Sequence, residues 1–208
     1  MRLTEPMTLS TDYLLGALAL WCAVRLLQQA EHAGAWTVRL WAVAMLMTAA
    51  AAFVGGSYHG FVRMLAPETG RMLWQITLIA TGLGSAALLA SAALAGTEGA
   101  LQKALLAIVL LKLGLYLWWI ASRTEFIFVI ADYGSALVGV VLLVWLARPS
   151  GLTPGASWIA GGVAVSVVAA AIQALRLAPH RDFNHNDLFH VVQMAAVYLL
   201  YRGGLLLR

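Results

Sequence analysis

Three histidines in this 208-residue chain fall where apolar segments begin or end, and their spacing indicates possible chemistry. His59 closes one apolar segment in the stretch GGSYHGF, while His185 and His190 open the last one in FNHNDLFHVVQM. Asp187 stands between the last two histidines. Imidazole suits zinc, and three protein ligands plus a water molecule make a hydrolytic site. The residue types therefore predict a zinc centre whose ligands are His59, His185 and His190.

Such a centre needs elements that bring distant parts of the chain together. The chain is 62% hydrophobic and only 11% charged, whereas a soluble domain has about 25% charged residues. Its apolar stretches are each close to the ~20 residues that cross the hydrocarbon layer of a membrane. We predict an all-α fold, an integral membrane bundle of seven transmembrane helices that forms a single domain over residues 1–208. The predicted helices span 12–29, 37–62, 72–95, 100–122, 125–147, 155–177 and 185–206.

In a bundle of this kind the end of the second helix and the start of the seventh lie at the same membrane face. We call it the N-face, because it also carries the N-terminus. Ionisable groups at membrane depth are costly, so by default they indicate function. The alternative for His59 is a neutral histidine bonded to a neighbouring helix. His185 lies five residues before His190, so both reach one ion only if the first helical turn is distorted; otherwise His185 is a loop residue.

Two further residues are candidates for catalysis. Asp187 shares a helix face with His190, three residues later, and is predicted to act as general base or to orient a ligand. Its alternative role is a first-turn carboxylate favoured by the helix dipole. Ser57 is about 200° from His59 on an ideal helix, so it joins the site only if the preceding Gly-Gly pair distorts the helix. Otherwise its hydroxyl bonds back to a backbone carbonyl.

A second polar group lies on the predicted fourth and fifth helices. Lys112 and Asp132 would both be in the hydrocarbon layer, at depths of about 16 Å and 10 Å below the N-face. A structural ion pair would neutralise both charges in lipid. The alternative makes Asp132 a substrate contact or proton acceptor. Asp12 follows Ser10 and Thr11 and is predicted to cap the first helix.

Composition excludes several classes of protein. The net charge of +4 comes from scattered Lys and Arg residues, and without a basic run no nucleic-acid partner is indicated. The single cysteine, Cys22, excludes an intrachain disulfide and a cysteine-based metal site. The first apolar segment has no cleavage pattern, so we expect it to be retained, in an integral membrane protein of a bacterial-type plasma membrane. Tryptophans expected in interfacial belts are Trp36, Trp41, Trp118, Trp119, Trp145 and Trp158.

These features resemble the seven-helix superfamily of alkaline ceramidases and progestin and adiponectin receptors, in which a histidine ends helix 2 and two histidines, four apart, lie on helix 7. His59 and His190 match the first and last of these, while the remaining histidine position falls on Asn186. The family's serine position falls on Gly55, and the nearest carboxylate to its helix 3 aspartate is Glu68. The resemblance implies zinc-dependent amide hydrolysis of lipid substrates.

Two functions follow from the sequence. The first is a zinc-dependent membrane hydrolase that acts on a lipid amide or ester, with membrane lipids as its surroundings and an apolar small molecule as substrate. The alternative is a non-catalytic receptor, sensor or transporter that binds a small ligand in the same polar pocket or relays protons. The last helix has no lysine for a retinal Schiff base, while His59 and His190 leave haem as a possible ligand.

Overall fold

The computed structural model describes residues 3–33, 36–146 and 154–207. In this part of the chain, seven α-helices and one short 3-10 turn confirm the all-α prediction. Six helices, α1 to α6, are long and apolar enough to cross a membrane. The elements are α1 (Pro6–Ala33), α2 (Trp36–Phe61), η1 (Val62–Met64), α3 (Pro67–Gly96), α4 (Gly99–Ile120), α5 (Phe126–Leu146), α6 (Pro154–Ala174) and α7 (His185–Gly204).

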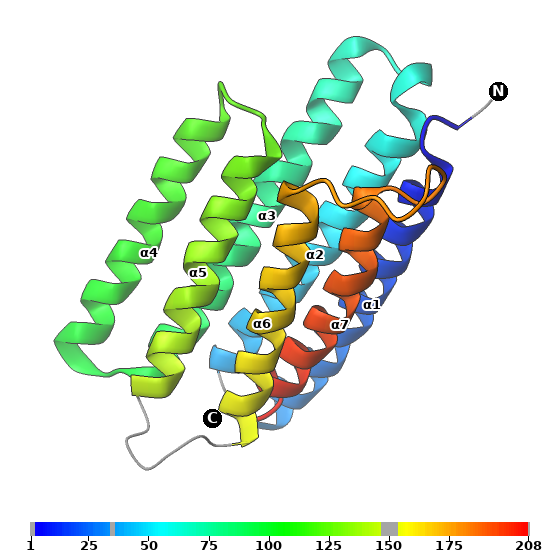
Figure 1. Cartoon of the computed structure of the whole chain (residues 1–208). Helices are drawn as coiled ribbons and strands as arrows, with labels where there is room; N and C mark the ends of the chain where they lie inside the picture. The colour runs from blue at the N-terminus through cyan, green and yellow to red at the C-terminus, as the bar shows by residue number, and fades with distance from the viewer. Residues whose placement is uncertain (1–2, 34–35, 147–153, 208) are drawn as a thin grey trace.

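Six of the helices enclose the centre of the bundle. α1 packs on α2, α2 on α3, α3 on α5, α5 on α6 and α6 on α7, and contacts between α7 and α1 close the ring. α4 stands outside this ring, at the left edge in Figure 1, and packs on α3. The N-terminal end of the chain, the segment between α6 and α7 and the end of α2 lie at one end of the bundle, the upper end in Figure 1. The predicted N-face therefore gathers the expected segments.

The first helix begins earlier than predicted, at Pro6 instead of residue 12. Proline suits a first helical turn because it has no N–H to leave unpaired. The prediction left the residues before 12 outside the helix, but Thr8, Thr11 and Asp12 all lie on α1 and are buried against α7. Asp12 lies in the second turn, so the prediction that it caps the helix is wrong. α3 likewise begins at Pro67, ahead of the predicted residue 72.

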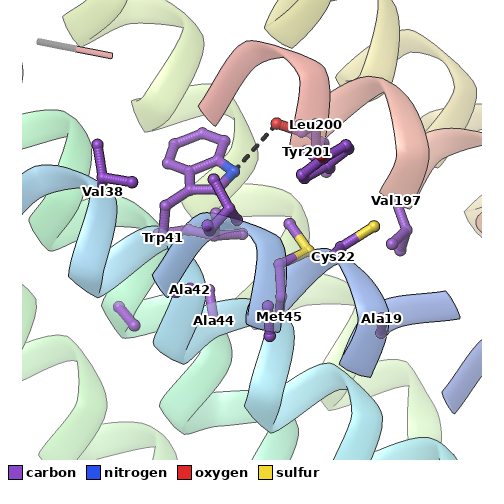
Figure 2. Packing of buried hydrophobic residues seen from close by; sticks show 14 of the residues in the cluster. Ala19, Cys22, Val38, Trp41, Ala42, Ala44, Met45, Val197, Leu200 and Tyr201 are labelled. Carbon is purple, nitrogen blue, oxygen red and sulfur yellow. Dashed lines mark hydrogen bonds between the residues drawn. The ribbon is translucent and has the colours of Figure 1, made fainter. Parts of the chain in front are cut away.

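The main hydrophobic core has residues from all six helices of the ring, and Figure 2 shows the part that joins α1, α2 and α7. Trp41 lies at its centre with no exposed surface, and its Nε1 donates to the Leu200 carbonyl over 3.0 Å. The predicted interfacial position of Trp41 is therefore wrong. Trp36 and Trp118 are 67% and 69% exposed, as an interfacial belt requires. A side chain at Gly204 would collide with the Trp41 ring, so the last turn of α7 needs glycine there.

Candidate functional site

A cavity of about 270 Å³ lies inside the six-helix ring, and every helix of the ring contributes to its wall. Five polar groups come from the N-face ends of the helices: Asp12 from α1, His59 from α2, Gln173 from α6, and Asn186 and His190 from α7. Its deeper wall is mainly apolar, with Thr48, Ser166 and Gln193 as polar exceptions. Val163 lies ten residues before Gln173 on α6, or about 15 Å away along a helix that rises ~1.5 Å per residue.

His190 lies in the wall of the cavity with both ring nitrogens already engaged. Its Nε2 is 3.1 Å from Asp12 Oδ1, and its Nδ1 is 3.0 Å from Thr11 Oγ1. The Thr11 hydroxyl also donates to the Thr8 carbonyl over 3.1 Å, which leaves its oxygen free to accept from His190 Nδ1. Asp12 and His190 Nε2 then share one proton. Either arrangement of that proton leaves the pair without net charge.

His59 lines the same cavity from the last turn of α2. Its Nδ1 is 3.3 Å from Glu5 Oε2, and the chain just before α1 is held there by a bond from Thr4 N to Gly60 O of 3.0 Å. The hydrogen bond with His59 holds the pKa of the Glu5 carboxyl below its ordinary value, against the opposite effect of partial burial. His59 and His190 therefore lie at one end of the bundle, as predicted, but each has its own carboxylate partner.

Asp187 is 1% exposed and does not belong to the cavity wall. One of its oxygens accepts from the Thr8 hydroxyl over 2.7 Å, and the other accepts from Asn184 N over 2.7 Å. Asn184 in turn accepts from the backbone of Asp187, which completes a capping box at the start of α7. The structure thus gives Asp187 the first-turn role that was the alternative to catalysis, and adds a buried bond from α7 to α1.

Two more predicted site residues also lie outside the cavity wall. Ser57 donates to the Phe53 carbonyl over 2.8 Å and lies 2.9 Å from the Tyr13 hydroxyl, so it bonds back to its own helix. His185 is the first residue of α7 and is half-buried. The glycines before His59 allow a close approach of two helices, since a Cβ on Gly56 would lie 2.8 Å from Asp12 Cβ. They bring α1 against α2.

The donor set does not fit the predicted three-histidine zinc centre. Zinc needs a free imidazole nitrogen from each ligand at ~2.0–2.1 Å, but both nitrogens of His190 are bonded within the protein and His185 lies outside the cavity wall. In the described parts of the chain, no three His, Cys, Asp or Glu side chains are placed to hold one metal ion. The zinc site stays a prediction from the sequence.

The cavity wall reaches the outer surface of the bundle between α5 and α6. Val138 on α5 and Val167 on α6 line the cavity, yet they are 57% and 60% exposed. Gly134, one turn before Val138, also lines the cavity, and a Cβ added there would meet no atom within 4 Å. The side wall is therefore open and apolar at the depth of these residues.

Sequence reasoning missed two residues of the site. Asp12 was assigned to a cap and Gln173 received no role, yet Asp12 binds His190 and Gln173 Nε2 donates to Asn186 Oδ1 over 2.8 Å. A signal for Asp12 was present in the sequence. Thr8, Thr11 and Asp12 are spaced for one helix face, and this polar face needs a polar partner in an apolar bundle.

Comparison with known proteins gives a family but no function. A model described as "Family of unknown function (DUF6962)" matches residues 7–208. No curated protein matches the chain, and no solved structure does. These comparisons do not link it to the alkaline ceramidases or the progestin and adiponectin receptors, so that resemblance stays a prediction.

Proposed function

We propose that this chain, which belongs to the DUF6962 family of unknown function, is a membrane protein that binds a single-chain amphiphile in its central cavity. All seven helices would span the bilayer, which we expect to be a bacterial-type plasma membrane. The observation that carries the proposal is one continuous cavity with a polar end and a mainly apolar body. Ligand sites typically combine a mainly apolar wall with a few convergent polar groups.

The open side wall supports entry from the membrane. Val138 and Val167 would lie in the hydrocarbon layer, because they are near the middle of α5 and α6. A hydrocarbon chain that passes between them moves from lipid to an apolar wall, so no polar group has to be removed from water. Aqueous solutes would find no polar group at this opening. The ligand is therefore a molecule that is already dissolved in the bilayer.

The polar end supports a ligand with a head group at the N-face. Asp12, His59 and Asn186 lie there at the ends of three different helices, so a head group would contact all three. The α7 residues also explain why this helix is the least apolar of the seven: its polar face meets the polar face of α1, through bonds from Thr8 to Asp187 and from Thr11 to His190. The bundle hides these groups from lipid.

Hydrolysis of a lipid amide or ester remains the second proposal, favoured by the position of His59, His190 and Asp12 in one cavity wall. Asp12 and His190 hold a shared proton beside the cavity and are the groups suited to general acid–base chemistry there. Asp187 and Ser57 are not, since their oxygens are bonded within and between helices away from the cavity. Binding is the step that both proposals require.

A substitution at the opening tests the binding proposal. Gly134→Leu fills open space at the entrance without a clash in the bundle, and we expect it to weaken binding of a straight-chain alcohol by about tenfold or more (~1.4 kcal/mol). The measurement is an equilibrium titration of detergent-purified protein by native mass spectrometry. Gly114→Leu is the matched control, because a Cβ there also meets no atom, on the outer helix α4. Equal affinity for both variants would contradict the presence of the bound chain at this opening.

A further inference from the structure

Three threonine hydroxyl groups in the cavity wall have no hydrogen left to offer a ligand. They belong to Thr48, Thr77 and Thr81. Each donates its hydroxyl proton to the carbonyl four residues earlier on its own helix, over 2.9–3.0 Å. A hydroxyl that has donated its proton can still accept hydrogen bonds. These threonines therefore present acceptors to whatever occupies the cavity.

Gln173 adds an acceptor that lacks a partner. Its Nε2 donates to Asn186 Oδ1 over 2.8 Å. Its Oε1 is buried and accepts no hydrogen bond from the part of the chain that the structure describes. A buried polar atom without a partner is destabilising, and Gln173 belongs to the cavity wall. A donor on a bound ligand would satisfy this oxygen.

The cavity offers little to an anion. None of the described residues that line it is Lys or Arg, and its one carboxylate residue is Asp12. His190 is already bonded at both nitrogens, to Asp12 and Thr11. His59 already faces the Glu5 carboxylate at 3.3 Å, so a carboxylate head group would be a buried charge without a free cation, which is strongly unfavourable. A cation would meet Asp12 and the faces of aromatic rings such as Trp74 and Phe189, which attract positive charge.

We infer that the head group of the bound amphiphile donates hydrogen bonds and carries no negative charge, so that the cavity selects long-chain alcohols and protonated amines over fatty acids. This inference rests on the proposed function, because it concerns the ligand of the same cavity. The head group donates to Gln173 Oε1 at the N-face end of the cavity. Its hydrocarbon chain extends toward Val163 and the opening at Val138 and Val167.

The test is competition among three compounds that share one alkyl chain: the alcohol, the amine and the carboxylate. Each displaces a photoreactive alkyl alcohol from the wild-type protein in detergent, at mildly alkaline pH where the carboxylate is charged. We expect the alcohol and the amine to compete at least about tenfold better than the carboxylate. Gln173→Leu should weaken the alcohol and the amine and leave the carboxylate unchanged. Gln75→Leu, outside the cavity, is the control.

A second variant tests the part that the Asp12 carboxyl group plays in binding the amine. Asp12→Asn keeps the size of the side chain but replaces the carboxyl group with an amide, so binding of the amine should weaken while the alcohol still binds. A carboxylate that competes as well as the alcohol in the wild-type protein would overturn the inference and leave the proposed function standing. If no compound displaces the probe from the cavity, the proposed function itself fails.

Discussion

Replacing Asp132 with Ala is expected to lower the free energy of unfolding by about 3–5 kcal/mol, the cost of leaving one member of a buried ion pair without its partner. Lys112 Nζ lies 2.5 Å from Asp132 Oδ1 and 3.0 Å from its backbone carbonyl, and Ser85 Oγ donates to Asp132 Oδ2. The two charged side chains are only 23% and 7% exposed. Without Asp132, the lysine charge remains in an apolar surrounding.

The double variant Lys112→Ala with Asp132→Ala should lose less stability than the single variant, because no charge is then left uncompensated. The measurement is denaturant-induced unfolding of the purified protein in mixed micelles. Glu68→Ala is a suitable control, since Glu68 and Arg71 form an ion pair that is about three-quarters exposed, and exposed pairs contribute roughly 0–1 kcal/mol. Equal losses for the single and double variants would argue against an energetic coupling of Lys112 with Asp132.

Replacing Trp41 with Ala should also be severe, with an expected loss of about 3–5 kcal/mol, as for other large aromatic residues removed from a core. The indole fills the space between α1, α2 and α7 (Figure 2) and bonds the Leu200 carbonyl. Trp41→Phe keeps most of the ring and should cost clearly less. Thermal unfolding followed by circular dichroism measures both variants.

The outer helix provides the control for Trp41. Trp118 lies on α4 and is 69% exposed, so Trp118→Ala removes an indole of equal size that no neighbouring helix encloses. We expect a change of roughly 0.5 kcal/mol or less, typical of surface positions. Similar unfolding temperatures for Trp41→Ala and Trp118→Ala would contradict the packing role of Trp41.

The ion pair shows what sequence could predict. Lys112 and Asp132 stand in apolar segments, where an isolated charge is too costly to persist, so each had to have a partner. The pairing is confirmed, although α4 packs on α3 and not mainly on α5 as a helical hairpin would. Ser85 of α3 completes the group. The cost of a buried charge predicted the contact, but the packing of the helices decided which third residue joined it.

The histidines show where sequence reasoning reached its limit. Spacing along a helix tells which residues share a face, and the end of α2 and the start of α7 do meet at the N-face. Spacing does not tell which neighbouring helix a face meets. Because Asp12 was placed in a cap, the partner of His190 was missed and zinc was assigned in its place. The same holds for Trp41, whose distance from the helix end suggested an interface, while Gly204 of α7 makes room for it in the core.

The central claim is that a hydrocarbon chain occupies the cavity, and photolabelling in lipid vesicles tests it most directly. A straight-chain alcohol with a diazirine near the end of its chain is irradiated with the protein, and the labelled residues are identified by mass spectrometry. We predict labels on Ala52, Leu137 and Val163, which line the cavity and are less than a tenth exposed, and loss of these labels with excess unlabelled alcohol. Labels confined to outward residues such as Leu110 and Leu111, which are 69% and 63% exposed, would contradict the account.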